Sequence, residues 1–266
     1  MQPIYLDNAA STRVSDDVLA RMTEVMRTAY GNPSAAHPQG AAARAYIETA
    51  RTQLLTAFGD TGGTTGVSPV GDIVWTSGCT EADALAVLGA ARARAGSIVL
   101  SSIEHPAVSA AAKNLETEGR RVLHVAPDAT GVLDPEAFAE ACRAGDGGAS
   151  VAAIVMVQNE IGVVQPVAAI AAAIRRVAPA CHIHCDAAQA FGKVALDATT
   201  LGVDSIAIAG HKFHGPKGTG ALWLRGGAEL RPLWVGGGQQ GGLRGGTQDA
   251  PGAAGLGLAA ERAIIQ

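Results

Sequence analysis

The sequence has little of what marks a nucleic-acid-binding or a membrane protein. Lys and Arg number 20 against 24 Asp and Glu, the net charge is -4, and no long run of either sign occurs. We therefore expect no nucleic-acid or anionic-membrane partner. The longest strongly apolar stretch, 150–157, is too short to cross a bilayer, and the N-terminus lacks the basic start and apolar run of a signal peptide. These absences favour a soluble, cytoplasmic protein with a small ligand.

Cysteine is scarce, whereas glycine is abundant. The four cysteines are Cys79, Cys142, Cys181 and Cys185. In a cytoplasmic chain of this size we expect reduced thiols rather than disulfides. The 34 glycines are spread among apolar segments, which predicts many tight turns and close backbone approaches.

Short apolar runs alternate with helix-length segments, and this pattern predicts the fold. We expect helices at 15 to about 30, 39–58 and 253–265, a surface loop at 59–71, and strands at 73–76, 98–101, 122–125, 152–157, 183–186, 205–209 and 221–224. Parallel neighbours need crossover connections, so this alternation indicates an α/β fold with a mainly parallel central sheet flanked by helices.

The domain organisation follows from the same pattern. We expect an N-terminal segment at 1–14, a large domain at 15–252, and the start of a truncated C-terminal region at 253–266. The last helix stops in mid-pattern, which suggests that the natural protein continues.

Ligands in open α/β sheets gather where strands end, and two such places carry ambiguous signals. The segment 76–81 follows a strand and opens a helix, so its free N–H groups and hydroxyls form either a phosphate cradle or an ordinary helix start. It matches neither the Rossmann nor the P-loop pattern. His105 follows the next strand and either stacks on an aromatic cofactor and exchanges protons, or is a surface residue.

Two further strand ends carry stronger signals. His182, His184 and Asp186 share one strand face, which permits a metal site, although zinc ligands usually come from more than one element. We favour the alternative, in which Asp186 keeps a pyridinium nitrogen protonated. Lys212 lies in a glycine-flanked turn after the next strand. It is either a solvated charge or an amine that forms a Schiff base, and Asp186 at the preceding strand end favours the amine.

Taken together, these stretches resemble the NifS/IscS-type cysteine desulfurases, in the class V aminotransferase branch of fold-type I enzymes that depend on pyridoxal 5′-phosphate (PLP). The matching stretches, in family order along nearly the whole chain, are Tyr5-Leu6-Asp7-Asn8-Ala9-Ala10-Ser11-Thr12, Gly31-Asn32-Pro33-Ser34, 76–81, Glu104-His105, Asn159-Glu160-Ile161-Gly162, His184-x-Asp186-x-x-Gln189, Gly210-His211-Lys212 and Arg244-Gly245-Gly246-Thr247. Each alone is weak, but their joint occurrence is very specific.

The resemblance implies a role for each matching residue around the cofactor ring. Lys212 would hold PLP as a Schiff base, and Asp186 would pair with the pyridine nitrogen. Gln189 and Asn159 would contact the side of the phenolic oxygen. His105 would stack on the ring and shuttle protons.

The resemblance also implies a phosphate site and a homodimer with shared active sites. Cys79, Thr80 and His211 would hold the phosphate, and Thr247 would reach the cofactor phosphate of the neighbouring subunit. The implied reaction removes sulfur from L-cysteine, giving L-alanine and a persulfide that a sulfur-acceptor or scaffold protein uses for iron–sulfur cluster or thio-cofactor assembly. No resident metal is implied.

The sequence departs from the family pattern in two ways. Ala209 stands where relatives often have a phosphate-binding serine, which removes one hydroxyl donor. The family's small C-terminal domain, with its nucleophilic cysteine and carboxylate-binding arginine, is mostly missing. Two alternatives therefore stay open. One is another class V activity, such as a selenocysteine lyase or a transaminase, and the other is a non-catalytic PLP-fold dimer or scaffold module.

Overall fold

The computed structural model describes residues 4–62, 70–144 and 147–265. Its α-helices are α1 (Asp16–Thr28), α2 (Pro38–Ala57), α3 (Cys79–Ala93), α4 (Pro106–Thr117), α5 (Pro135–Arg143), α6 (Val167–Val177) and α7 (Ala250–Ile265). Its strands are β1 (Gly71–Thr76), β2 (Ser97–Ser101), β3 (Val122–Val125), β4 (Ala149–Val155), β5 (His182–Asp186), β6 (Ser205–Ala209) and β7 (Gly220–Arg225). The structure also has the short 3-10 helices η2 (Gly210–Lys212) and η3 (Gln239–Gly242).

The strands form one sheet in the order β1-β7-β6-β5-β4-β2-β3. The neighbours from β6 to β3 pair in parallel, and β7 pairs antiparallel with both β6 and β1. The prediction of an α/β fold with a mainly parallel sheet is therefore confirmed. Because β4, β5 and β6 run in the same direction, the residues that follow them meet at one edge of the sheet.

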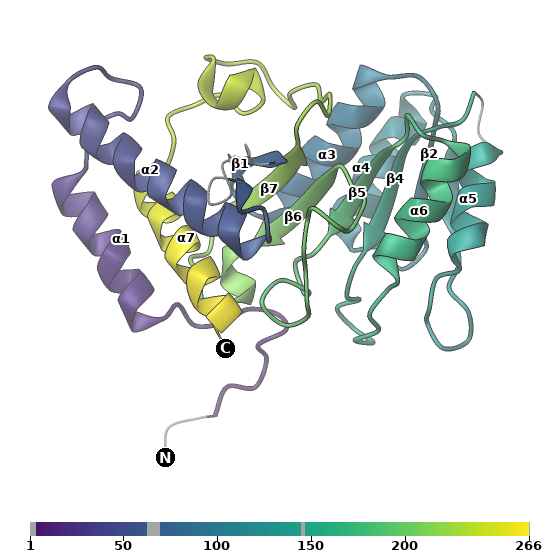
Figure 1. Cartoon of the computed structure of the whole chain (residues 1–266), viewed down its shortest axis with the longest axis horizontal. Helices are drawn as coiled ribbons and strands as arrows, with labels where there is room; N and C mark the ends of the chain where they lie inside the picture. Colours follow the sequence, from purple (N-terminus) through teal and green to yellow (C-terminus); the bar gives the residue numbers. More distant parts are fainter. Residues whose placement is uncertain (1–3, 63–69, 145–146, 266) are drawn as a thin grey trace.

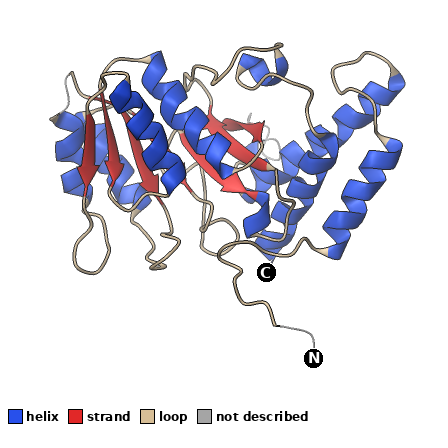
Figure 2. Ribbon diagram, turned by 180° about the vertical axis from the view of Figure 1, so that it is seen from behind, coloured by secondary structure: helices blue, strands red, loops and turns tan. Residues whose placement is uncertain are grey.

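Helices cover both faces of the sheet (Figures 1 and 2). One buried cluster joins the sheet to α3 and α4, and a larger one joins it to α5, α6, α2 and α7. Helices α1 and α2 pack against α7 at the side of the sheet that carries β1. None of the described helices combines the length and apolar character needed to span a membrane.

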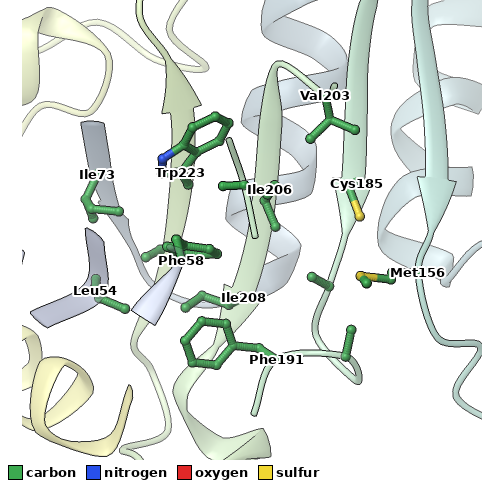
Figure 3. Packing of buried hydrophobic residues seen from close by; sticks show 14 of the residues in the cluster. Leu54, Phe58, Ile73, Met156, Cys185, Phe191, Val203, Ile206, Ile208 and Trp223 are labelled. Carbon is green, nitrogen blue, oxygen red and sulfur yellow. The ribbon is translucent and has the colours of Figure 1, made fainter. Parts of the chain in front are cut away.

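Aromatic packing fixes the turn after β6 against the core. Figure 3 shows Phe58 and Phe191 within this buried cluster. The Phe191 ring lies 5.2 Å from that of Phe58, at the end of α2, and 4.7 Å from that of Phe213. Phe213 directly follows Lys212 in the sequence. These contacts anchor the residue next to the predicted cofactor lysine in the buried core.

The boundaries differ modestly from the sequence-based expectations. β4 begins and ends earlier than the expected 152–157, because Val157 forms only an isolated bridge with Val164 beyond the strand end. Ser15 precedes α1, but its hydroxyl donates to the Asp17 carboxylate at 2.7 Å instead of capping the helix backbone. The expected loop at 59–71 lies largely outside the described residues.

Candidate active site

Two adjacent cavities lie where β4, β5 and β6 end. The smaller, of about 260 Å³, is lined by Asp7, Ala9, Ala10, Cys79, His105, Val155, Val157, Asn159, Asp186, Ala188, Gln189 and Lys212. The larger, of about 470 Å³, shares Ala9, Val157, Asn159, Gln189 and Lys212 with it and extends towards Lys193 and His214. The structure thus brings six predicted site residues together around the smaller cavity: Cys79, His105, Asn159, Asp186, Gln189 and Lys212.

Three other predicted residues do not line either cavity. Thr80 is exposed in the first turn of α3, and Thr247 is exposed in the segment before α7. His211 is half-buried, with its Nδ1 3.2 Å from the Ser11 hydroxyl.

Lys212 ends the short η2 helix that follows β6. Its Nζ donates to the carbonyl oxygens of Ala9 and Ala10 at 2.7 and 3.1 Å. Burial lowers the pKa of this ammonium, while the nearby Cys79 and Asp186 oppose the shift. A lowered pKa increases the fraction of neutral amine, the form that attacks a carbonyl group.

Asp186 ends β5 and is only 4% exposed. Its Oδ1 accepts from the backbone N–H of Ala188 at 2.9 Å and lies 3.6 Å from the Cys79 thiol. Burial raises the pKa of this carboxyl, whereas the hydrogen bond from the Ala188 N–H group and the nearby Lys212 ammonium oppose the rise. A buried carboxylate is costly unless it is paired, so a cationic N–H group in the cavity would stabilise it.

His105 is both a helix cap and a cavity wall. It precedes α4, and its Nδ1 accepts from the backbone N–H of Ala107 at 3.2 Å. In the neutral ring this bond leaves the proton on Nε2. The side chain is thus held in one orientation beside the cavity.

The start of α3 offers backbone donors next to Cys79. The first helical hydrogen bond runs from Ala82 N–H to Gly78 O, so the three preceding N–H groups, of 79–81, have no partner within the helix. Glu81 accepts from the backbone N–H of Ser77 at 2.6 Å and pairs with Arg244 at 2.9 Å. These bonds fix the loop that leads into the helix and tie it to the 244–247 segment.

Gln189 is oriented by a residue that the sequence-based reasoning missed, Lys193. The Lys193 ammonium donates to Gln189 Oε1 at 2.8 Å, and Gln189 Nε2 donates to Ala9 O at 2.7 Å. An ammonium can only donate, so the amide oxygen must face Lys193 and the NH₂ group must face the N-terminal segment. The four-residue spacing between the two side chains was the available signal.

A buried polar chain extends from the small cavity into the core. The Cys79 thiol lies 3.9 Å from Asp83 Oδ1, which is 3.0 Å from His184 Nε2. His184 Nδ1 and His182 Nε2 lie 2.9 and 2.8 Å from the Ser205 hydroxyl. Burial lowers the pKa of His184 to about 3, so this ring is neutral at pH 7. Asp83 was missed, although a polar residue on the apolar face of a helix was a usable signal.

These hydrogen bonds also concern the alternative interpretation of residues 182–186 as a metal site. The two histidines do lie on one strand face, but both ring nitrogens of His184 and the Nε2 of His182 are engaged with Ser205 and Asp83. Within 4–62, 70–144 and 147–265, the set of possible metal-ligand atoms that lie within 4.8 Å of one another is Cys79, Asp83 and Asp186. This set contains neither histidine.

The chemistry of these donors fits PLP. The Lys212 amine suits its aldehyde, the buried Asp186 carboxylate suits its protonated ring nitrogen, and the backbone N–H groups at the start of α3 suit its phosphate. Ala209, at the buried end of β6, supplies no hydroxyl. A missing hydrogen bond of this kind costs about 1–3 kcal/mol.

Known proteins resemble this chain closely. The sequence matches the family described as aminotransferase class-V over residues 4–263. The cysteine desulfurase of Gluconacetobacter diazotrophicus is 40% identical over 266 residues, covering 99% of this chain and 64% of that protein. The cysteine desulfurase of a Nostoc species is 38% identical over 267 residues, covering 100% of this chain and 64% of that protein. The chain thus spans less than two thirds of the length of these relatives.

Solved structures agree with the sequence matches. A NifS-like protein superposes with a TM-score of 0.90 at 35% identity, covering 99% of this chain and 70% of that protein. A structure described as SspA in complex with cysteine gives a TM-score of 0.88 at 37% identity, covering 97% of this chain and 72% of that one.

Proposed function

Because the chain belongs to the aminotransferase class-V family, we propose that it forms the PLP-binding part of a cysteine desulfurase. The reaction would remove sulfur from L-cysteine and give L-alanine and a persulfide, used for iron–sulfur cluster or thio-cofactor assembly. The observation that carries this proposal is the convergence of Lys212, Asp186 and His105 on one cavity. The identity to cysteine desulfurases supports it, as does the similarity to a structure that holds cysteine.

We propose the following roles for the residues of this chain. Lys212 binds the cofactor covalently, and Asp186 holds the proton on the ring nitrogen. His105 lies against the ring, and Asn159 and Gln189 contact the side of its phenolic oxygen. Cys79, Thr80 and His211 bind the phosphate group of the cofactor. Thr247 binds the cofactor phosphate of a second subunit in a homodimer.

When bound, PLP supplies an aldehyde and a ring that withdraws electrons from the substrate. The Lys212 amine would be the base that takes the proton from the substrate Cα and later returns it. His105 exchanges a proton at its Nε2, because its Nδ1 is engaged as the helix cap. The carbonyl oxygens of Ala9 and Ala10 hold the Lys212 ammonium beside the cavity.

The thiol that receives the sulfur is proposed to lie outside residues 1–266. Cys142, Cys181 and Cys185 are at most 1% exposed. Burial and two neighbouring carboxylates raise the pKa of the Cys79 thiol, which therefore stays protonated and weakly nucleophilic. We further propose that 15–252 form the cofactor-binding domain and 253–266 begin the next region, and that the protein works in the cytoplasm.

Reduction with borohydride followed by intact-mass measurement tests the cofactor assignment. The chain incubated with PLP is expected to gain the mass of one cofactor, and Lys212→Ala is expected to gain none. Lys217→Ala, an exposed lysine in the same turn, is the matched control and should behave as the parent. Equal labelling of Lys212→Ala and the parent would refute the role of Lys212. With PLP and a thiol reductant, release of alanine from cysteine tests the reaction itself.

A further inference from the structure

A separate pocket lies at the ends of the strands opposite the candidate active site. Its volume is about 230 Å³, close to that of the smaller active-site cavity. It is lined by Ala180 to His182, where β5 begins, by Asp204, just before β6, and by Arg225 to Ala228, where β7 ends. The cavities around Asp186 and Lys212 are at the other ends of β5 and β6. The two sites are therefore separated by the length of the strands.

The lining of this pocket carries an excess of positive charge. Arg94, Arg175 and Arg225 line it together with one carboxylate, that of Asp204. Asp204 forms a close ion pair with Arg175, and its Oδ2 also accepts from the backbone N–H of Ile183 at 2.8 Å. Arg225 Nε is 4.0 Å from Asp204 Oδ1, and no ion pair is found for Arg94 in the described part of the chain. Two guanidinium charges are thus poorly compensated.

The three guanidinium groups are held in place by the backbone. Arg94 donates to Ala180 O, Arg175 Nη1 donates to Cys181 O at 2.5 Å, and Arg225 Nε donates to Val203 O at 2.9 Å. Arg225 also lies over the Trp223 ring, 5.6 Å from its centroid, which adds a cation–π contact. Side chains that are already fixed lose little further entropy when a ligand binds.

If these arginines only stabilised the ends of the strands, part of the arrangement would be explained. This structural role accounts for the N–H groups that donate to carbonyl oxygens. It leaves the two terminal nitrogens of Arg225 without an acceptor among the described residues, on a side chain that is only 28% exposed. Fixed, half-buried guanidinium groups with free N–H donors are the usual receptors for phosphate and carboxylate oxygens.

We propose that this arginine pocket, formed by Arg94, Arg175, Arg225 and the backbone around them, binds a small dianion of the phosphate type. Three guanidinium groups against one carboxylate leave a net positive charge in the pocket that matches a dianion better than a single carboxylate. His182, which also lines the pocket, is buried and neutral at pH 7, because burial lowers its pKa to about 4. The site is independent of the proposed activity and of the cofactor.

Calorimetric titration of the chain with inorganic phosphate, against chloride at equal ionic strength, tests the proposal. Saturable binding is expected, and Arg225→Met and Arg94→Met should each weaken it at least about tenfold. Arg176→Met is the matched control. Arg176 is a neighbouring, exposed arginine that pairs with Glu136 outside the pocket, and its loss should change the affinity by less than about twofold.

Three outcomes would overturn the proposal. They are the absence of saturable phosphate binding up to about 10 mM, unchanged affinity in the Arg94→Met and Arg225→Met double variant, or weakened binding in Lys212→Ala. The last result would place the phosphate in the active-site cavity. If the Met variants fail to fold, Arg225→Lys decides, because it keeps the charge but loses the forked donors. It should still bind phosphate several-fold more weakly, and equal affinity would contradict the proposed contact.

Discussion

At the scale of single residues, Glu104 is a buried acid with an unusual ionisation. Its Oε1 accepts from the Ser101 hydroxyl and, at 2.8 Å, from the backbone N–H of Val155, while its Oε2 has no partner among the residues that the structure describes. Burial raises its pKa to about 8, with the charge of Asp186 adding to the rise. The folded protein therefore keeps this carboxyl protonated at pH 7, whereas the unfolded chain ionises it.

This difference predicts how stability depends on pH. Between pH 6.5 and 8 the folded state holds the Glu104 proton and the unfolded state does not, so the free energy of unfolding should fall as pH rises. Glu104 should contribute about 1–2 kcal/mol to this fall. Below pH 6.5 the buried His182 and His184, whose pKa values are lowered, act in the opposite direction.

Urea unfolding of the cofactor-free chain at pH 6.5 and pH 8 measures this effect. Glu104→Gln keeps the acceptor oxygen and cannot ionise, so its stability should change less between the two pH values. Glu116→Gln, an exposed position on α4, serves as the control and should retain the full dependence. An unchanged pH dependence in Glu104→Gln would rule out this role for the buried acid.

At the scale of elements, the beginnings of α3 and β7 are in direct backbone contact. A Cβ atom added at Gly220 would lie 2.7 Å from both Gly78 Cα and Ile208 O. These are backbone atoms, which cannot move aside without shifting a whole element. The position of the α3 start, and with it the proposed phosphate site, therefore depends on a glycine in a strand far along the sequence.

Gly220→Ala should consequently displace α3. We expect a loss of about 1–3 kcal/mol in the free energy of unfolding, because overpacking forces the backbone apart. We also expect a weaker affinity for PLP, measured by fluorescence titration. Gly238→Ala is the control, since its Cβ would meet no atom within 4 Å and its φ of -77° suits any residue. If the Gly220→Ala variant were less stable but bound PLP with normal affinity, Gly220 would be needed for packing and not for the proposed phosphate site.

At the scale of the whole molecule, several large apolar side chains are exposed on the described surface. Leu6 is 84% exposed, Tyr30 74%, and Trp234 and Val235 are 49% and 94% exposed. Trp234 and Val235 belong to the same segment as the exposed Thr247, between β7 and α7. Such exposure is typical of a surface that another subunit covers.

We therefore expect the chain to form a homodimer that buries this segment. Light scattering after size exclusion should give twice the chain mass of 26.8 kDa. Val235→Asp should weaken the dimer by at least about tenfold, because a charge would be buried at the interface. Thr247→Ala should weaken PLP binding in the dimer without dissociating it. A monomer at every protein concentration would contradict this arrangement.

Much of the fold could be predicted from the sequence, because strands and helices follow from local periodicity. The positions of Asp186 and Lys212 at strand ends were predictable for the same reason, and the parallel sheet then brings such ends to one edge. The ends of β4 were less accurate, since Val157 is apolar but pairs only in an isolated bridge. The apolar character of a residue does not by itself show whether the residue belongs to a strand or to an isolated bridge beside it.

The sequence by itself determined the alternation of elements and the motif set that identifies the family, because both depend on neighbouring residues. Only the tertiary structure decided that Asp83 meets His184, 101 residues away, and that Arg94 joins Arg175 and Arg225 in one pocket. Such contacts depend on the order of strands in the sheet. That order is set by the packing of the whole core, which no local pattern encodes.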